Sequence, residues 1–225
     1  MIAAAGGWPV SRIVIDLAVH LAALIVGAAL AFIPDQAPSA LAYFAVARLA
    51  YVAAVAFGLR AQSRRLGREP REVAEERHRV FNRRILRLQN IDAIAFGALC
   101  VATRWTMSSE PWDWAGMVAG ILLIGVGVGT KTWAVRCLGP DSYTWHDFFV
   151  PREAFKPCRK GPYRYFKDPM YTIGYLQAYG FALAFGSWYG LVASLFAQAT
   201  ILIVNVCVEK PHFRRLCSVE PLKIP

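Results

Sequence analysis

Charged residues are scarce in this sequence, and the residue clusters that build common metal sites are missing. Only 18% of the 225 residues are charged, against about a quarter in ordinary soluble domains. The four histidines form no HxxHH cluster, which argues against a di-iron membrane desaturase. Neither a nucleophile elbow nor an HExxH zinc motif occurs. We therefore predict no metal site.

The cysteines also give no sign of a metal site or of disulfide bonds. The five cysteines show no short paired spacing, so neither a zinc knot nor a disulfide framework is predicted. Apolar residues make up 56% of the chain and the mean hydropathy is +0.38, which excludes intrinsic disorder. The remaining class is a protein that crosses a membrane several times.

Long apolar runs predict the fold. Four runs can cross about 30 Å of hydrocarbon as helices, namely residues 13–33, 39–59, 90–107 and 115–135. Residues 172–208 contain no charge and would form a single helix about 55 Å long, too long for one crossing. A hairpin of two short spans that turns at residues 186–190 is therefore expected. Residues 67–88 have amphipathic spacing and are predicted to lie along the membrane interface and to run into the third span. The expected fold is an all-α bundle of about six spans that ends in a helical hairpin.

Basic residues are concentrated in three segments. Residues 60–87, 131–167 and 210–223 hold 22 of the 25 lysines and arginines. Because positive residues keep loops on the cytoplasmic side, we expect these segments, both termini and the active site to face the cytoplasm. This distribution accounts for most of the net charge of +10, and no nucleic-acid partner is predicted. The first span is interpreted as a membrane anchor rather than a cleaved signal.

Several ordered motifs surround the hairpin. They are Gly161-Pro162-Tyr163-Arg164-Tyr165, then Lys167-Asp168-Pro169-Met170-Tyr171, and Glu209 before an amphipathic tail. Together they resemble the integral-membrane S-adenosylmethionine-dependent methyltransferases. The resemblance is greatest to phosphatidylethanolamine N-methyltransferases, which carry Asn-Pro-Met-Tyr, a later Gly, a preceding Gly-x-Gly and a Glu-Glu pair after the hairpin. The isoprenylcysteine carboxyl methyltransferases are related.

The resemblance implies a domain organisation and a cofactor. It covers about residues 125–216, which implies a methyltransferase core at 61–225 behind a two-helix membrane anchor at 1–60. The cofactor would be S-adenosylmethionine, released as S-adenosylhomocysteine. The expected cofactor-binding residues are Gly125, Gly127, Gly129, Lys131, Tyr171, Gly174, Glu209, Lys210 and His212. From spacing alone, the glycines favour close helix packing instead, and Lys210 stands where the family has a second Glu.

The implied reaction is methylation of a membrane lipid amine, first of all phosphatidylethanolamine, on the route to phosphatidylcholine. An amine with a pKa of about 10 arrives protonated and must lose a proton before it attacks. The expected catalytic residues are Asp168, Tyr171, Glu209 and His146, with Asp168 as the first choice of base. Alternatively, Asp168 caps a helix, Glu209 forms a surface ion pair, and His146 is an ordinary loop residue.

Cations are expected to hold the lipid phosphate. The expected substrate-binding residues are Arg159, Lys160, Arg164, Lys167 and Arg48. The four loop cations could instead serve only to set topology. Arg48 lies in the middle of a span, where a charge is costly, so it could instead pair with Asp16 or Asp92. Two other functions remain open: carboxyl O-methylation of an isoprenylated cysteine, and a non-catalytic membrane scaffold or small transporter. The oligomeric state is not predicted.

Overall fold

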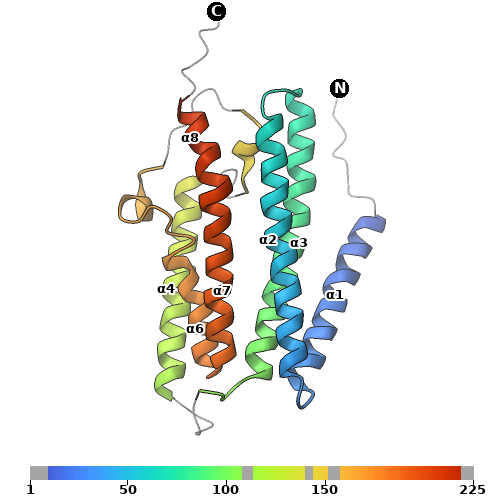
Figure 1. Cartoon of the computed structure of the whole chain (residues 1–225), viewed down its shortest axis with the longest axis vertical. Helices are drawn as coiled ribbons and strands as arrows, with labels where there is room; N and C mark the ends of the chain where they lie inside the picture. The colour runs from blue at the N-terminus through green and yellow to red at the C-terminus, as the bar shows by residue number, and fades with distance from the viewer. Residues whose placement is uncertain (1–9, 108–113, 140–143, 152–157, 219–225) are drawn as a thin grey trace, which may run out of the picture.

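The computed structural model describes residues 10–107, 114–139, 144–151 and 158–218, and the regular elements in these ranges are all helical. The long helices α1 (Val10–Phe32), α2 (Ala37–Arg65), α3 (Arg71–Ala102), α4 (Trp114–Leu138) and α7 (Trp188–Val204) form an upright bundle (Figure 1). The predicted all-α fold is confirmed.

Five helical stretches of the described chain are long and apolar enough to cross a membrane. Four of them belong to α1–α4, and the fifth runs from Trp188 to Cys217. This last stretch joins α7, a π-helical turn at Asn205–Glu209 and α8 (Lys210–Ser218). The protein is thus built as an integral membrane protein.

The predicted hairpin is present, with a short first arm. Helix α6 (Leu176–Ala184) has nine residues, about 14 Å of helix, which is less than half of the about 30 Å hydrocarbon core. The chain approaches it through 3-10 turns at Gly161–Arg164 and Ile173–Tyr175. Irregular backbone at membrane depth is tolerated where it is buried in protein or lines a cavity. This segment lines a cavity, described below.

The predicted interfacial segment takes a different position. Residues 71–88 do not lie across the bundle but form the first half of α3, which continues without a break to Ala102. No proline or glycine interrupts the helix between Arg71 and Phe96, so nothing kinks it. Its upper half packs on α2, where a Cβ at Gly58 would lie 2.5 Å from the Phe81 ring. The segment runs into the third span, as predicted, but it does not lie along the interface.

Two buried apolar clusters connect the N-terminal helices to the hairpin. The upper cluster joins residues of α2, such as Val55 and Leu59, to Phe148 and to Ile201 of α7. The lower cluster joins Phe44 of α2 to Leu99 of α3 and to further residues of α7. The expected domain boundary at residue 60 falls inside α2.

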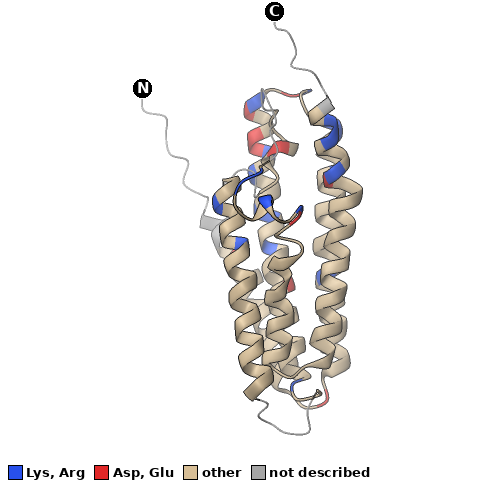
Figure 2. Cartoon of the chain, turned by 90° about the vertical axis from the view of Figure 1, so that its left-hand side faces the viewer, with Lys and Arg blue, Asp and Glu red and all other residues tan. Residues whose placement is uncertain are grey.

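Charged residues gather at one end of the bundle. Figure 2 shows most Lys, Arg, Asp and Glu residues at the upper end, above a long section that is almost uncharged. There α2 and α4 end, α3 begins and α8 lies (Figure 1). The described parts of the three basic segments therefore meet on one side.

Candidate functional site

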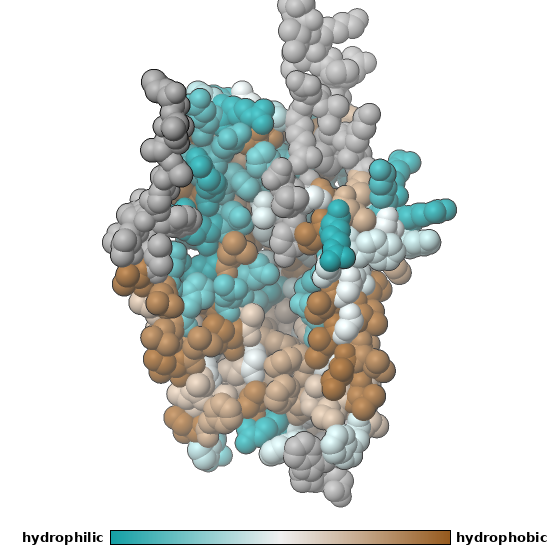
Figure 3. Space-filling view, turned by 180° about the vertical axis from the view of Figure 1, so that it is seen from behind, coloured by the Kyte–Doolittle hydropathy of each residue, from teal (hydrophilic) through white to brown (hydrophobic). Residues whose placement is uncertain are grey.

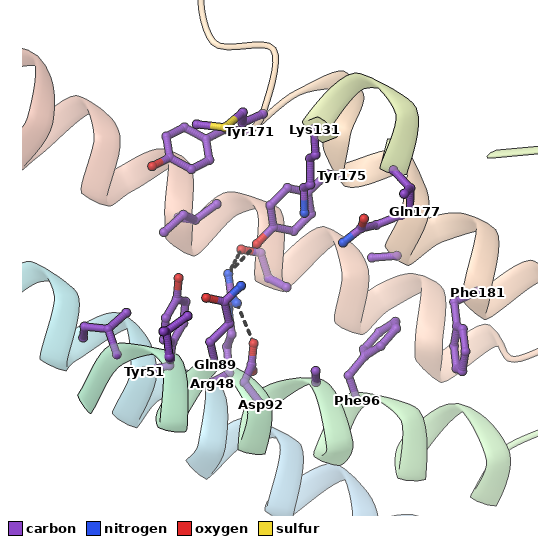
Figure 4. A pocket seen from close by; sticks show the side chains of 18 of the residues that line it. Arg48, Tyr51, Gln89, Asp92, Phe96, Lys131, Tyr171, Tyr175, Gln177 and Phe181 are labelled. Carbon is purple, nitrogen blue, oxygen red and sulfur yellow. Dashed lines mark hydrogen bonds and ion pairs between the residues drawn. The ribbon is translucent and has the colours of Figure 1, made fainter. Parts of the chain in front are cut away.

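A cavity of about 420 Å³ lies between α2 and α3 on one side and α4, α6 and α7 on the other. In Figure 4, Arg48, Tyr51, Gln89 and Asp92 face Lys131, Tyr171, Tyr175 and Gln177 across it. Phe96 and Phe181 make the other end apolar. The cavity is thus polar towards the charged end of the bundle and apolar deeper in the bundle.

One flank of the cavity lies between α3 and α4. Both helices line the cavity, yet they have almost no contact with each other. From behind, hydrophilic side chains extend downward from the charged end between two apolar flanks (Figure 3). An amphipathic molecule can therefore approach the cavity sideways from the membrane.

Glu209 lies next to the polar end of the cavity, in a cage of two neutral donors. Its Oε1 accepts hydrogen bonds from the Tyr171 hydroxyl at 2.7 Å and from Trp145 Nε1 at 2.9 Å. Both donors line the cavity. The carboxylate is buried, and no cation of the described chain forms an ion pair with it. Lys210 next to it acts on Glu209 through its charge without an ion-pair contact, so the carboxylate oxygens remain suited to a cationic ligand.

Local backbone features position the side chains of this cage. Glu209 closes the π-helical turn between α7 and α8, and such turns often mark functional sites because they rotate the residues that follow. Trp145 has a φ of 56°, which is uncommon for a bulky residue. Gln198 of α7 donates to the Tyr171 carbonyl at 3.0 Å. The motif expected at 167–171 and the expected Glu209 are thereby brought together.

His212 is close to this cage in sequence but is used by the protein itself. Its Nδ1 is 2.8 Å from Ser63 Oγ of α2, and its Nε2 is 3.2 Å from the Asp147 carbonyl. The ring also stacks on Phe148 with centroids 3.8 Å apart. Donation from Nε2 to the carbonyl leaves Nδ1 as acceptor for the Ser63 hydroxyl. The geometry gives His212 the role of fixing α8 against α2.

Asp168 and Lys210 bind each other. Lys210 Nζ lies 2.8 Å from Asp168 Oδ2, and neither residue lines the cavity. The Asp168 side chain makes no helix-capping bond in the described chain; its main-chain carbonyl instead accepts from Thr172 Oγ1 at 2.9 Å. This ion pair links the start of the hairpin to its end.

Arg48 is bound by several protein groups. Its guanidinium lies 2.8 Å from Asp92 Oδ2 and donates to the Tyr175 hydroxyl at 2.7 Å and Thr200 Oγ1 at 3.1 Å. It also donates to the Ala197 carbonyl. The expectation of a buried partner is confirmed with Asp92, whereas Asp16 pairs with Arg87. Arg48 also lines the cavity.

Lys131 enters the cavity from α4. Its Nζ lies 5.2 Å from the centroid of the Tyr175 ring. Its aliphatic stem passes over Gly174, where a Cβ would lie 2.8 Å from Lys131 Cγ. Two residues expected at the cofactor are thus in contact, and Gly174 provides the space that Lys131 occupies.

The three expected cofactor glycines face different directions. Gly127 is buried, and a Cβ there would overlap the backbone of Gln177 in α6. Gly125 and Gly129 are exposed, with open space where a Cβ would be. Gly120 packs against Gly180 in the same way as Gly127 packs against α6. Close helix packing therefore explains Gly127, and the three glycines do not form one surface.

The loop residues expected at the site are not in the cavity. Arg159, Lys160, Arg164 and Lys167 are exposed and none lines the cavity. The His146 ring packs edge-on against His78, with centroids 4.8 Å apart. Tyr163 lies between Lys160 and Arg164 in the sequence. Burial raises the pKa of its hydroxyl above the ordinary value, so that group stays neutral.

Sequence reasoning missed the contribution of α3. Gln89 and Asp92 line the cavity together with Ile85 and Phe96. These residues follow one another at spacings of four, three and four, which places them on one face of a helix. Two polar residues on an apolar stripe were the available signal.

Comparison with known proteins found similarity in the C-terminal part of the chain. Residues 115–218 match the profile of the phospholipid methyltransferase family. A phosphatidylethanolamine N-methyltransferase of Malassezia globosa is 33% identical over 131 residues, 57% of this chain and 12% of that protein. Its namesake from Schizosaccharomyces japonicus is 30% identical over 122 residues, 52% of this chain and 14% of that protein.

The aligned region is thus only about an eighth of the length of these relatives. No solved structure matches the chain. The motifs around the hairpin lie within the matched region, as the resemblance in the sequence predicted. The similarity to the phospholipid methyltransferase family therefore lies in residues 115–218, a little under half of the chain.

Proposed function

We propose that this protein is an integral-membrane methyltransferase that uses S-adenosylmethionine to methylate a phospholipid amine, first of all that of phosphatidylethanolamine. The observation that carries the proposal is the buried Glu209 carboxylate, held by Trp145 and Tyr171, which line the polar end of the cavity. The names of the relatives support the same substrate class.

The Glu209 cage fits the methyl donor. S-adenosylmethionine supplies a methyl group bound to a positively charged sulfur. A carboxylate and the faces of Trp145 and Tyr171 stabilise such a cation. Glu209 accepts from two neutral donors and forms no direct ion pair in the described chain, so the ligand would provide a cation in contact with it.

We place the proton acceptor at Tyr171 and Glu209 instead of at Asp168. The substrate ammonium must lose a proton, and the Tyr171 hydroxyl can take it while passing its own proton to Glu209 over their 2.7 Å bond. Asp168 is bound to Lys210, and His146 packs on His78 away from the cavity lining. The protein otherwise positions its two substrates and excludes water.

We place the site on the cytoplasmic side of the membrane. The basic residues gather at the bundle end that holds the Glu209 cage (Figure 2), and an excess of Lys and Arg marks cytoplasmic loops. The water-soluble cofactor would then enter from the cytoplasm, and the lipid from the bilayer.

The test is transfer of a labelled methyl group by the purified full chain in lipid nanodiscs. Phosphatidylethanolamine should be labelled and a farnesylated cysteine analogue should not. Glu209→Gln should lower the rate at least about tenfold, whereas the control Glu72→Gln, at an exposed position of α3, should leave it unchanged. Labelling of the cysteine analogue alone would establish carboxyl methylation instead, and failure to bind the cofactor would overturn both.

A further inference from the structure

The charges inside the cavity do not balance. Its lining contains two cations, Arg48 and Lys131, but one carboxylate, Asp92. Asp92 is bound to Arg48 at 2.8 Å. No acidic side chain of the described chain pairs with Lys131, whose recorded contact is with the Tyr175 ring. An ionisable group at membrane depth usually faces a partner or a ligand, and Lys131 lacks a protein partner of opposite charge.

Arg48 is less available to a ligand than Lys131. Four of its five N–H donors are directed at Asp92, Tyr175, Thr200 and Ala197. The Lys131 ammonium has no hydrogen bond to the described protein. The cation available to a ligand is therefore Lys131.

The protein is shaped to hold Lys131 there. Gly174 leaves room for its stem, since a Cβ would come within 3.1 Å of Lys131 Cε as well as 2.8 Å of Cγ. Figure 4 shows the ammonium between Tyr175 and Gln177, pointing across the cavity towards Arg48 and Asp92. The cation is directed into the cavity and away from the cytoplasmic loops.

The cavity presents its chemistry in a fixed order. Tyr171, which binds Glu209, lies at one end, Lys131 and Tyr175 lie in the middle, and Phe96 and Phe181 lie at the other end (Figure 4). A phospholipid has the same order of amine, phosphodiester and acyl chains. The barely touching flanks of α3 and α4 leave room for its chains to reach the membrane.

We propose that the Lys131 ammonium binds the phosphodiester of the substrate lipid, so that the lipid amine reaches Tyr171 and the acyl chains pass Phe96 and Phe181. This inference rests on the proposed function and assigns the phosphate to a cavity lysine instead of to the exposed loop cations. The cofactor carboxylate is the other anion that could use Lys131, and the experiment below separates the two.

The variants are Lys131→Gln, the charge-conserving Lys131→Arg, and Gly174→Ala, which crowds the lysine stem. Arg136→Gln is the matched control, because Arg136 is an exposed cation on the same helix. Each full-length protein is purified in detergent and checked for its thermal midpoint. Removal of a partly buried charge that has no countercharge should not lower that midpoint, so loss of binding in Lys131→Gln with an unchanged midpoint is not a folding defect.

Binding is measured without turnover, by titration of dioctanoyl phosphatidylethanolamine and, separately, of S-adenosylmethionine. Lys131→Gln should raise the Kd of the lipid about tenfold, equivalent to about 1.4 kcal/mol, and change the cofactor Kd less than about twofold. Lys131→Arg should keep most of the lipid affinity, Gly174→Ala should lose part of it, and Arg136→Gln should lose none. A dioctanoyl amine without phosphate should bind wild type and Lys131→Gln equally.

Two results would overturn the inference. A raised cofactor Kd with unchanged lipid binding would assign Lys131 to the cofactor carboxylate. Unchanged binding of both ligands would remove Lys131 from the site. If the phosphate-dependent lipid binding is found but no methyl group is transferred, the proposed function fails while the phosphate site stands.

Discussion

The buried pair of Arg48 and Asp92 allows a prediction of stability. Their side chains are only 4% and 12% exposed, and removing one member of such a pair costs about 3–5 kcal/mol. Arg48 keeps three other hydrogen-bond acceptors when Asp92 is lost, so we expect Asp92→Leu to cost about 3 kcal/mol. At about 2–4 °C per kcal/mol for a chain of this size, the thermal midpoint should fall by about 6–12 °C.

The assay is thermal unfolding in detergent, followed by tryptophan fluorescence. Arg48→Met and Asp92→Leu are compared singly and combined, because an apolar pair of similar volume often replaces a buried ion pair without loss. The double variant should therefore recover most of the midpoint that each single variant loses. The control is Arg71→Gln, which breaks the exposed pair with Glu75 on α3 and should cost at most about 1 kcal/mol.

Additive effects would refute this reasoning. If the double variant loses the sum of the two single losses, Arg48 and Asp92 act independently and their 2.8 Å contact carries no coupling. If Asp92→Leu costs no more than Arg71→Gln, the pair is not buried in the way that the structure describes.

Three further predictions concern the site. Glu209→Gln should raise the Kd of S-adenosylmethionine at least about tenfold in a folded protein, and unchanged affinity by titration calorimetry would reject the cage. Gly127→Ala should lower the free energy of unfolding by about 1–3 kcal/mol, because the added methyl group forces α4 away from α6. Gly125→Ala, where the methyl group meets open space, should not lower it. Loss of cofactor affinity in Gly125→Ala would instead support a cofactor contact. Asp168→Asn should reduce turnover less than about threefold at neutral and alkaline pH alike, because it only weakens the pair with Lys210; a loss at neutral pH that alkaline pH restores would make Asp168 the base.

Much of the fold was predictable because it depends on local composition. Apolar length and the position of charge identified the long helices, and the residues at 186–190 identified the turn of the hairpin. The turn before α7 is made by Gly186, with a φ of 58°, and by Ser187, whose Oγ accepts from the Gly190 amide. The charge of Arg48 in the middle of a span is costly without a partner. The sequence offered two candidates for that partner, Asp16 and Asp92.

The hairpin was expected to have two short arms, but the start of α6 was not predictable from apolar length. Residues 172–208 are uniformly uncharged, so composition does not reveal where the helix gives way to 3-10 turns. That boundary depends on α4, since Gly120 and Gly127 allow α6 to pack against it at backbone contact. The same dependence on tertiary packing explains why the role of each glycine could not be assigned from spacing.

Two substitutions within the family motif become intelligible only in three dimensions. The chain has Asp168 where the resembling family has Asn, and Lys210 where it has a second Glu. Taken singly in the sequence, each weakens the resemblance, but the two side chains lie 2.8 Å apart. The retained residues, Tyr171 and Glu209, likewise bind each other, at 2.7 Å. The altered pair joins the ends of the hairpin outside the cavity, and the retained pair joins them at the cavity. A change of charge at one member of the outer pair is therefore compensated at the other, and the inner pair keeps the position that the proposed chemistry requires.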